Sequence, residues 1–281
     1  DSSYRMKNQL QVIIRIARRS VDNLLRHLET GEMKPEFFEK YFSKEDELDY
    51  IHMVLEDGIT MDMNGIIDRV DIKETEDAVY MKVIDYKSGN KDIDYIEMAE
   101  GRQMQLAVYM SVMTEFLEKK YPDKRIVPSG MYYFQLADKL AVGTDDSDIE
   151  KNRIKDSRMT GIVNSDDKCL EFLDHKTGDV VPVLYKDGAV SSRNTHVVTE
   201  AELRAISDFT RNKMIETGMK IIRGQIEMRP RKGDASPCNF CDYRSVCRFE
   251  AGLGGNNYAI GSKYDKEQAK ELIFDNFLER N

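Results

Sequence analysis

Two stretches decide the fold: Gly65–Asp71, which reads GIIDRVD, and Val83–Gly89, which reads VIDYKSG. In both, apolar β-branched residues surround the charged ones, as is typical of strands in a partly buried sheet. The segment Glu74–Asp77 between them is polar and predicts a turn. The sequence therefore predicts an antiparallel hairpin with strands at about 59–72 and 78–87.

Three charged residues of this hairpin are predicted to share one face. Asp85 and Lys87 are two apart on a strand, so their side chains project to the same side. Asp68 and Asp85 are equally distant from a turn at Glu76 and Asp77, which places them opposite each other, with Cβ atoms roughly 4.5–5.5 Å apart. Carboxylates so close repel each other unless a cation lies between them, and Mg²⁺ suits hard oxygen ligands. An ammonium beside such a site can assist attack of water on a phosphodiester.

The alternative interpretation is a half-exposed hairpin whose charges have no function, because D-x-K often occurs by chance. Gly65 and Gly89 favour the functional interpretation, since glycine lets backbone or ligand approach closely. Downstream, Gln105 and Tyr109 are four residues apart on a helix predicted over 97–120 and share one face. This pair either lines the mouth of the site or packs into the sheet.

The remaining pattern predicts an α/β fold, a mixed sheet with helices packed on it. A helix is expected over 3–30, where Gly31 ends it, and Pro35 is expected to open a short second helix. Further expected elements are a strand over 47–56 that turns at Asp57-Gly58, a strand over 126–137, a helix from the capping box Thr199/Glu202 to about Arg223, and a short final helix near 265–279.

The composition excludes several classes of protein. With 41% hydrophobic and 33% charged residues, the 281-residue chain can bury a core beneath a strongly solvated surface. It has no apolar run that could span a bilayer and no signal-peptide core, so we expect a cytoplasmic protein without a membrane partner. The net charge of −9 disfavours DNA globally, although the first helix and residues 229–232 carry local basic runs. An ATPase is excluded because the chain has no GxxxxGK[ST] loop.

Three of the four cysteines, Cys238, Cys241 and Cys247, form C-x2-C-x5-C. Without a secretory signal, this spacing favours a metal or iron–sulfur site over disulfides. The fourth, Cys169, lies in the amphipathic stretch KCLEFLD. There a small buried thiol is the more common role, and a fourth ligand is the alternative.

The chain resembles the RecB-like nucleases of the PD-(D/E)XK type, and among them the B subunits of AddAB-type helicase–nucleases. The resemblance rests on G-I-I-D-R-V-D, I-D-Y-K-S-G and Q-L-A-V-Y in this order, with R-M-T-G-I-V-N and the ending Y-R-S-V-C-R-F-E. It implies a restriction-endonuclease-like core in which Asp68 and Asp85 bind Mg²⁺ and Lys87 assists the water. It further implies that Gln105 and Tyr109 complete the site.

The resemblance also implies a cofactor and partners. The domain would degrade single-stranded DNA fed from a helicase, the 5′-ended strand in double-strand-break repair, beside an A subunit. Cys238, Cys241 and Cys247 would bind a [4Fe–4S] cluster together with a cysteine before the first helix. We expect that cysteine and the family's catalytic His to lie outside this chain, which begins inside a predicted helix. The cluster is then expected to be absent or incomplete, with 236–250 held by packing of Phe240, Tyr243, Val246 and Phe249.

Two further residues are interpreted as structural. His27 is expected on the surface of the first helix. Asp71 differs from Asp68 in parity and is interpreted as a charge at the end of a strand. We expect one nuclease domain and a tail, with these divisions: the domain over 1–250, its core at about 44–137, an insertion at about 138–198, a helix and cysteine segment over 199–250, and the tail over 251–281.

Two other functions compete with a helicase-linked nuclease. One is a DNA-binding or docking module that keeps the fold without catalysis, and the intact set of Asp68, Asp85 and Lys87 argues against it. The other is a cluster-bearing nuclease of the CRISPR-adaptation kind. The long insertion and the R-M-T-G-I-V-N piece favour the helicase-linked type.

Overall fold

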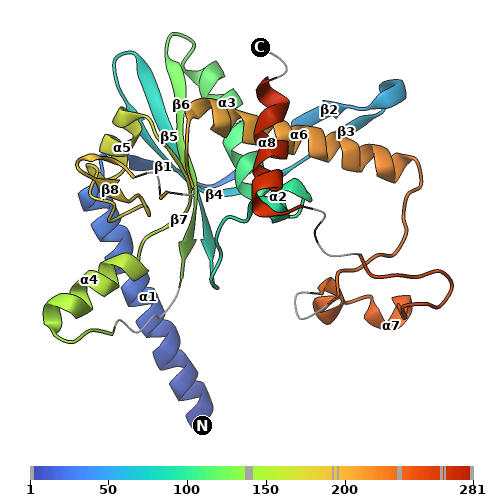
Figure 1. Cartoon of the computed structure of the whole chain (residues 1–281), viewed down its shortest axis with the longest axis horizontal. Coiled ribbons are helices and arrows are strands. Elements are labelled where there is room, and N and C mark those ends of the chain that lie inside the picture. Colours follow the sequence, from blue (N-terminus) through green and yellow to red (C-terminus); the bar gives the residue numbers. More distant parts are fainter. Residues whose placement is uncertain are drawn as a thin grey trace.

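The computed structural model describes residues 3–136, 142–191, 193–194, 196–232, 236–259, 262 and 264–278, and in this part of the chain a six-stranded mixed sheet forms the centre (Figure 1). The strands lie in the order β1 (Lys34–Phe42), β4 (Gly65–Glu74), β5 (Ala78–Lys87), β6 (Arg125–Gln135), β7 (Thr160–Asn164) and β10 (Val197–Val198). The pairs β5–β6 and β7–β10 are parallel, and the other neighbours are antiparallel. The predicted α/β class is confirmed.

Helices cover both faces of this sheet (Figure 1). On one face α3 packs against β5, β6 and α6, and α8 packs against α2 and α6; on the other face α5 contacts β6 and α1. We call these the α3 face and the α5 face. The helices are α1 (Tyr4–Thr30), α2 (Tyr95–Ala99), α3 (Gln105–Lys120), α4 (Asp146–Asp156), α5 (Asp167–Asp174), α6 (Glu200–Ile222), α7 (Arg244–Cys247) and α8 (Lys266–Leu278), with short 3-10 turns at Glu56–Gly58 and Pro237–Phe240.

The alternation of β5 assigns its side chains to the two faces. Val79, Met81 and Val83 belong to the apolar cluster under α3 and α6, whereas Tyr80 and Ile84 belong to the cluster under α5. A strand alternates its side chains with a period of two, so the row that begins at Val79 continues on the α3 face through the next odd-numbered positions. The buried strand therefore presents its last two charged odd-numbered residues beside the start of α3.

The register of the hairpin β4–β5 is the predicted one. Arg69 pairs with Ile84 and Asp71 with Lys82, and the turn is closed by a 2.8 Å hydrogen bond from Thr75 N–H to the carbonyl of Ala78. The hairpin across Asp57-Gly58 is also confirmed, as β2 (Ile51–Val54) and β3 (Thr60–Met63). The remaining pair is β8 (Tyr185–Lys186) and β9 (Ala189–Val190).

Three predicted elements differ from the structure. The predicted second helix at Pro35 is wrong: this segment is β1, an edge strand, where proline is tolerated. The single strand predicted over 59–72 is two strands in separate sheets. The change occurs at Gly65, where a Cβ would lie 2.7 Å from the ring of Phe42, so a larger residue would displace that ring.

The long helix predicted over 97–120 is interrupted between α2 and α3. Gly101 has φ +75°, a left-handed conformation that ends α2. The strand predicted over 126–137 is β6, and the capped helix is α6, with both hydrogen bonds of the Thr199/Glu202 capping box. The final helix is α8. Position 137 of that predicted strand, position 279 of that helix and the start of the 138–198 insertion lie outside the described residues.

In the described part of the chain, no helix combines the length and the apolar character that a membrane span requires.

Candidate active site

Asp68, Asp85 and Lys87 lie together at one end of the β4–β5 pair, on the α3 face. Asp68 Oδ2 accepts a 2.8 Å hydrogen bond from the backbone N–H of Tyr86. Extending the observed register by one pair places Asp68 opposite Asp85. The two carboxylates therefore occupy adjacent antiparallel strands, as the sequence predicts.

Asp85 is a buried carboxylate with one oxygen that accepts no hydrogen bond. It is 1% exposed, and its Oδ2 lies 2.5 Å from Lys87 Nζ. That contact is an ion pair without hydrogen-bond geometry, so no hydrogen bond satisfies this oxygen. Burial raises the pKa of Asp85; the ion pair with Lys87 opposes this shift and the charge of Asp68 adds to it. The ionised form is therefore under-stabilised, and a cation at this point would relieve it.

Lys87 is held by α3. Its Nζ donates a 3.1 Å hydrogen bond to Gln105 Oε1, and Gln105 Nε2 donates a 2.7 Å bond to the hydroxyl of Tyr109. The ring of Tyr133 lies 5.8 Å from the ammonium. Lys87 is about one-third exposed, so the ammonium reaches solvent while its position is fixed from both sides. The structure brings together all five residues that the sequence singles out on the hairpin and α3.

The hydroxyl of Tyr109 lies in the electrostatic field of the same carboxylates. Burial raises the pKa of its hydroxyl most, the hydrogen bond from Gln105 opposes the shift, and the charges of Asp85, Asp68 and Glu39 add to it. The phenol is therefore protonated at neutral pH and can donate a hydrogen bond.

Glu39 is a residue that the sequence analysis missed. In β1, Phe38 pairs with Arg69 and Lys40 with Ile67, so Glu39 stands opposite Asp68. Its φ of 44° is left-handed, which is uncommon for a non-glycine residue within a strand. The sequence analysis missed Glu39 because it predicted a helix at this segment. A strand prediction with the correct register would have aligned Glu39 with Asp68 and Asp85.

The residues present fit a hard divalent cation. Asp68 and Asp85 offer carboxylate oxygens, and Asp85 has an oxygen without a hydrogen bond. Among the described residues, no three His, Cys, Asp or Glu side chains are gathered closely enough to enclose a metal ion. Magnesium is commonly held by one or two carboxylates and keeps several waters, so two opposed aspartates suffice for it.

On the α5 face, behind this site, lies a buried charge cluster. Asp71 is fully buried and receives two hydrogen bonds from Arg69, at 2.5 Å from Nε and 2.7 Å from Nη2. Lys82 Nζ lies 3.4 Å from the same carboxylate, and the hydroxyl of Tyr86 lies 3.4 Å from Arg69 Nη1. The interpretation of Asp71 as a strand-end charge is wrong, because the strand continues to Glu74 and α5 covers this face.

His27 borders that cluster, and its interpretation as a helix-surface residue is also wrong. It is 4% exposed, its ring lies edge-on to Phe134 at 5.7 Å, and its Nε2 has no hydrogen bond. Burial, with the charges of Lys82, Arg26 and Arg69, lowers the pKa of His27 to about 3. The imidazole is neutral, and it lies on the face of the sheet opposite to the carboxylates.

The three C-terminal cysteines line one pocket of 440 Å³, together with Arg244, Arg248 and Tyr258. This cysteine segment stands apart from the sheet (Figure 1). The predicted packing is wrong for three of its four side chains, since Phe240, Tyr243 and Val246 are 85%, 75% and 81% exposed. Only Phe249 finds a partner, the ring of Tyr258 at 5.1 Å, because so short a segment cannot enclose its own apolar side chains.

Cys169 belongs to a different part of the molecule. It is fully buried in α5 within the apolar cluster of the α5 face, and burial raises its pKa to about 12. The cysteine segment, which includes α7, lies on the other side of the molecule (Figure 1). The core interpretation of Cys169 is confirmed, and the alternative as a fourth ligand is not supported.

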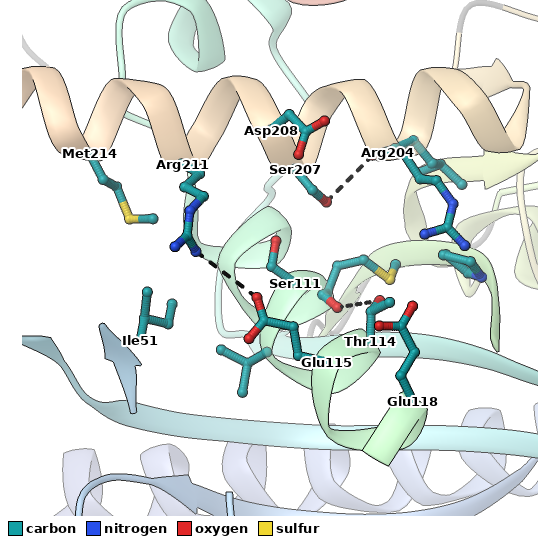
Figure 2. Close-up of a pocket in the computed structure, with 14 residues that line it drawn as sticks. Ile51, Ser111, Thr114, Glu115, Glu118, Arg204, Ser207, Asp208, Arg211 and Met214 are labelled. Atoms are coloured by element: carbon teal, nitrogen blue, oxygen red, sulfur yellow. Dashed lines mark hydrogen bonds and ion pairs between the residues drawn. The ribbon is translucent and has the colours of Figure 1, made fainter. Parts of the chain in front are cut away.

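A second pocket lies between α3 and α6, with a volume of 270 Å³ (Figure 2). Its floor is apolar and its rim carries charges of both signs, including Glu115 and Arg211, whose side chains are 4.0 Å apart. None of the five site residues lines it. This pocket is therefore separate from the carboxylate–lysine site.

Comparison with known proteins agrees with the geometry. Residues 4–248 match the model of the PD-(D/E)XK nuclease superfamily. The chain is 32% identical over 282 residues to the B subunit of the ATP-dependent helicase/deoxyribonuclease of Clostridium botulinum (strain Loch Maree / Type A3), covering 97% of this chain and 24% of the relative. The corresponding B subunits of Lachnoclostridium phytofermentans and Alkaliphilus metalliredigens are each 31% identical over 287 residues, covering 97% and 99% of this chain and 24% of each relative.

The chain thus spans about a quarter of the length of these curated relatives. The matched region contains the sheet, the hairpin with its opposed aspartates, α3 and the cysteine segment. The chain belongs to the PD-(D/E)XK nuclease superfamily.

Proposed function

We propose that this domain hydrolyses DNA phosphodiesters with a magnesium ion held by Asp68 and Asp85. The observation that carries the proposal is the buried carboxylate of Asp85, which stands opposite Asp68 and is paired with Lys87. A purely structural ion pair would not require a second carboxylate on the adjacent strand, because like charges directly opposite each other destabilise a sheet. The nuclease family of the chain supports the same conclusion.

When bound, the cation would supply Lewis-acid activation of water and of the phosphodiester. The chain's own residues contribute positioning and charge. An ammonium has three donors, and Lys87 donates one hydrogen bond to Gln105 and forms an ion pair with Asp85, so a donor remains for the attacking water or a phosphoryl oxygen. There it stabilises the negative charge that develops during in-line attack. Gln105 and Tyr109 act on Lys87 by fixing its position from α3.

Glu39 adds negative charge on the strand next to Asp68. It is exposed, so we assign it an outer role, in attracting the cation or orienting its waters. The three cysteines line one pocket without converging on a single ion, and we propose that they would supply three of the four ligands of a larger [4Fe–4S] cluster. A fourth ligand has to come from elsewhere than Cys169.

We further propose that the domain works in a helicase–nuclease complex, as the names of its relatives suggest. It would receive single-stranded DNA from a helicase, degrade the 5′-ended strand in break repair, and act in the cytoplasm beside an A subunit. We keep the domain division expected from the sequence as part of this proposal: the nuclease domain spans 1–250 and a tail spans 251–281.

The test is cleavage of 5′- and 3′-labelled single-stranded DNA by the full chain with Mg²⁺, with EDTA as the control. Magnesium-dependent products that vanish in the Asp68→Asn and Asp85→Asn variants support the proposal. A wild-type chain that binds DNA and magnesium but yields no products would make this a non-catalytic module. Products that persist in both variants would place the chemistry elsewhere.

A further inference from the structure

The amino-terminal part of α1 concentrates positive charge in an otherwise acidic chain. Between Tyr4 and Val21, five residues are Arg or Lys and none is Asp or Glu, whereas the whole chain has a net charge of −9. Three of the five, Arg15, Arg18 and Arg19, are spaced three and four residues apart and so share one side of the helix. Arg15 and Arg18 are exposed and Arg19 is half-buried.

This helix runs past the end of the sheet that carries the candidate site. His27 lies against Phe134, and Phe134 pairs with Tyr86, between Asp85 and Lys87. Beyond Thr30 the chain enters β1, whose start pairs with Ile72, farther from that end. Toward the N-terminus α1 therefore leaves the sheet at the level of the site and continues outward, as Figure 1 shows. With a rise of about 1.5 Å per residue, Arg19 lies roughly 12 Å beyond His27 and Arg5 roughly 33 Å beyond it.

We propose that the basic side of α1, defined by Arg15, Arg18 and Arg19, binds the phosphate backbone of the DNA strand at the end of the sheet that carries the candidate site. The proposal rests on the function proposed above and names the surface that guides that substrate. A polyanion gains no general attraction from a domain with a net charge of −9, so it requires a local patch of positive charge near the site. Arginine on a regular helix supplies sequence-independent phosphate contacts, which suits a strand that moves through the site.

The opposite side of α1 points to a competing partner. Leu10, Ile13 and Val21 are exposed on it, and a basic amphipathic helix with an exposed apolar side can also lie on an anionic membrane. The location at the end of the sheet that carries the site favours DNA, since a membrane partner would gain nothing from that position. Binding to lipid is therefore an outcome for the test.

The experiment measures binding of a fluorescein-labelled single-stranded oligonucleotide to the full chain by anisotropy, in EDTA, across salt concentrations. The test variant is R15Q/R18Q/R19Q, because glutamine has nearly the helix propensity of arginine. The matched control, K119Q/K120Q/K124Q, removes the same charge at the opposite end of the sheet, where Lys124 pairs with Glu74 beside the β4–β5 turn. R15K/R18K/R19K keeps the charge, and circular dichroism melts verify folding of each variant.

We expect the glutamine variant to lose about tenfold or more in affinity near 0.1 M salt and to flatten the plot of log K against log salt by about 2, at roughly 0.7 per phosphate contact. The control and the lysine variant should keep the wild-type slope. Equal losses of DNA affinity in the test and control variants would show that only the net charge of the domain matters, and would overturn the proposal. So would wild-type binding by R15Q/R18Q/R19Q, or a wild-type chain that binds phosphatidylserine vesicles and no DNA.

The EDTA condition separates this inference from the proposed function. A wild-type chain that binds through α1 yet cleaves nothing with Mg²⁺ would leave the α1 surface in place and remove the nuclease proposal. If R15Q/R18Q/R19Q binds DNA normally while the wild type cleaves it, the α1 surface is removed and the nuclease proposal stays in place. If both proposals hold, the variant should show a raised KM with kcat unchanged.

Discussion

The carboxylate of Asp68 is fixed by the backbone N–H of Tyr86, at 2.8 Å, in the strand that carries Asp85 and Lys87 on either side of that tyrosine. Because the donor is a backbone group of a buried strand, the carboxylate cannot move without disturbing the hairpin. The same tyrosine directs its hydroxyl to Arg69 on the other face of the sheet. The site is thus anchored in the register of β4 and β5, and its charges are held in place before any cation or substrate arrives.

Asp85→Asn is expected to abolish magnesium-dependent cleavage, by roughly a thousandfold or about 4 kcal/mol in the barrier. The metal-free domain should keep or slightly gain stability, because burial and Asp68 disfavour the ionised form. Since the folded-state pKa is raised, this group's contribution to stability falls as pH rises from the ordinary aspartate pKa through the raised value. Urea unfolding in EDTA at several pH values checks this. A variant that cleaves like the wild type would refute the assignment.

Lys87→Ala should reduce turnover by about a hundredfold while magnesium affinity holds or rises. The ammonium is not a ligand, and its ion pair with Asp85 competes with the cation. Single-turnover cleavage and calorimetric titration with Mg²⁺ separate the two quantities. Gln105→Leu is the milder companion, expected to cost about tenfold in rate because Lys87 loses one acceptor. Lost magnesium affinity at an unchanged rate would contradict the role given to Lys87.

Glu39→Gln should weaken magnesium binding by about three- to tenfold and leave the maximal rate nearly unchanged at high Mg²⁺. An outer carboxylate attracts the cation without contacting the reacting atoms. Glu36→Gln on the same strand is the matched control, with the same change of charge in a residue that pairs with Lys120 at 3.8 Å. Equal magnesium affinities of the two variants in calorimetry would remove Glu39 from the site.

His27 should make the domain sensitive to mild acid. Its pKa is lowered to about 3 in the folded chain, so in mildly acidic solution His27 is protonated in the unfolded chain and neutral in the folded one. The stability from neutral His27 is complete above about pH 6.5 and is lost as pH falls toward 3. Denaturant unfolding between pH 7 and 4.5 should show a smaller decline for His27→Met than for the wild type. Parallel declines would show that other groups dominate the acid response.

The cysteine segment should be dispensable for folding of the sheet. Three thiolates can hold an iron–sulfur cluster only weakly, so we expect fewer than four irons per chain in protein purified in air. C238S/C241S/C247S should melt within a few degrees of the wild type, because the sheet carries its own core. Iron analysis and thermal melts provide the measurement. A brown protein with four irons per chain, or a sheet that orders only with iron, would contradict this expectation.

Periodicity and turn chemistry determined much of this molecule. The hairpin register follows from the polar turn and from the period of two, which together place Asp68 opposite Asp85 in any sheet these strands form. The capping box at Thr199 and the helical spacing in α1 likewise predict their elements, because those interactions are local. The PD-(D/E)XK resemblance could be read from three motifs because the chemistry requires these residue types at fixed spacing.

What the sequence left undecided depends on neighbours distant in the chain. Pro35 begins an edge strand because β4 offers a partner to β1, and no local signal outweighs the helical preference of proline at a first turn. Asp71 and His27 are buried because α1 and α5 cover the α5 face, and burial of a charge or an imidazole depends on that packing alone. Glu39 joins the row of Asp68 and Asp85 only through the third strand. The spacing of residues in the sequence predicts helices, strands and turns, because these depend on near neighbours. Burial, pKa shifts and the assembly of the site arise from contacts that only the folded chain makes.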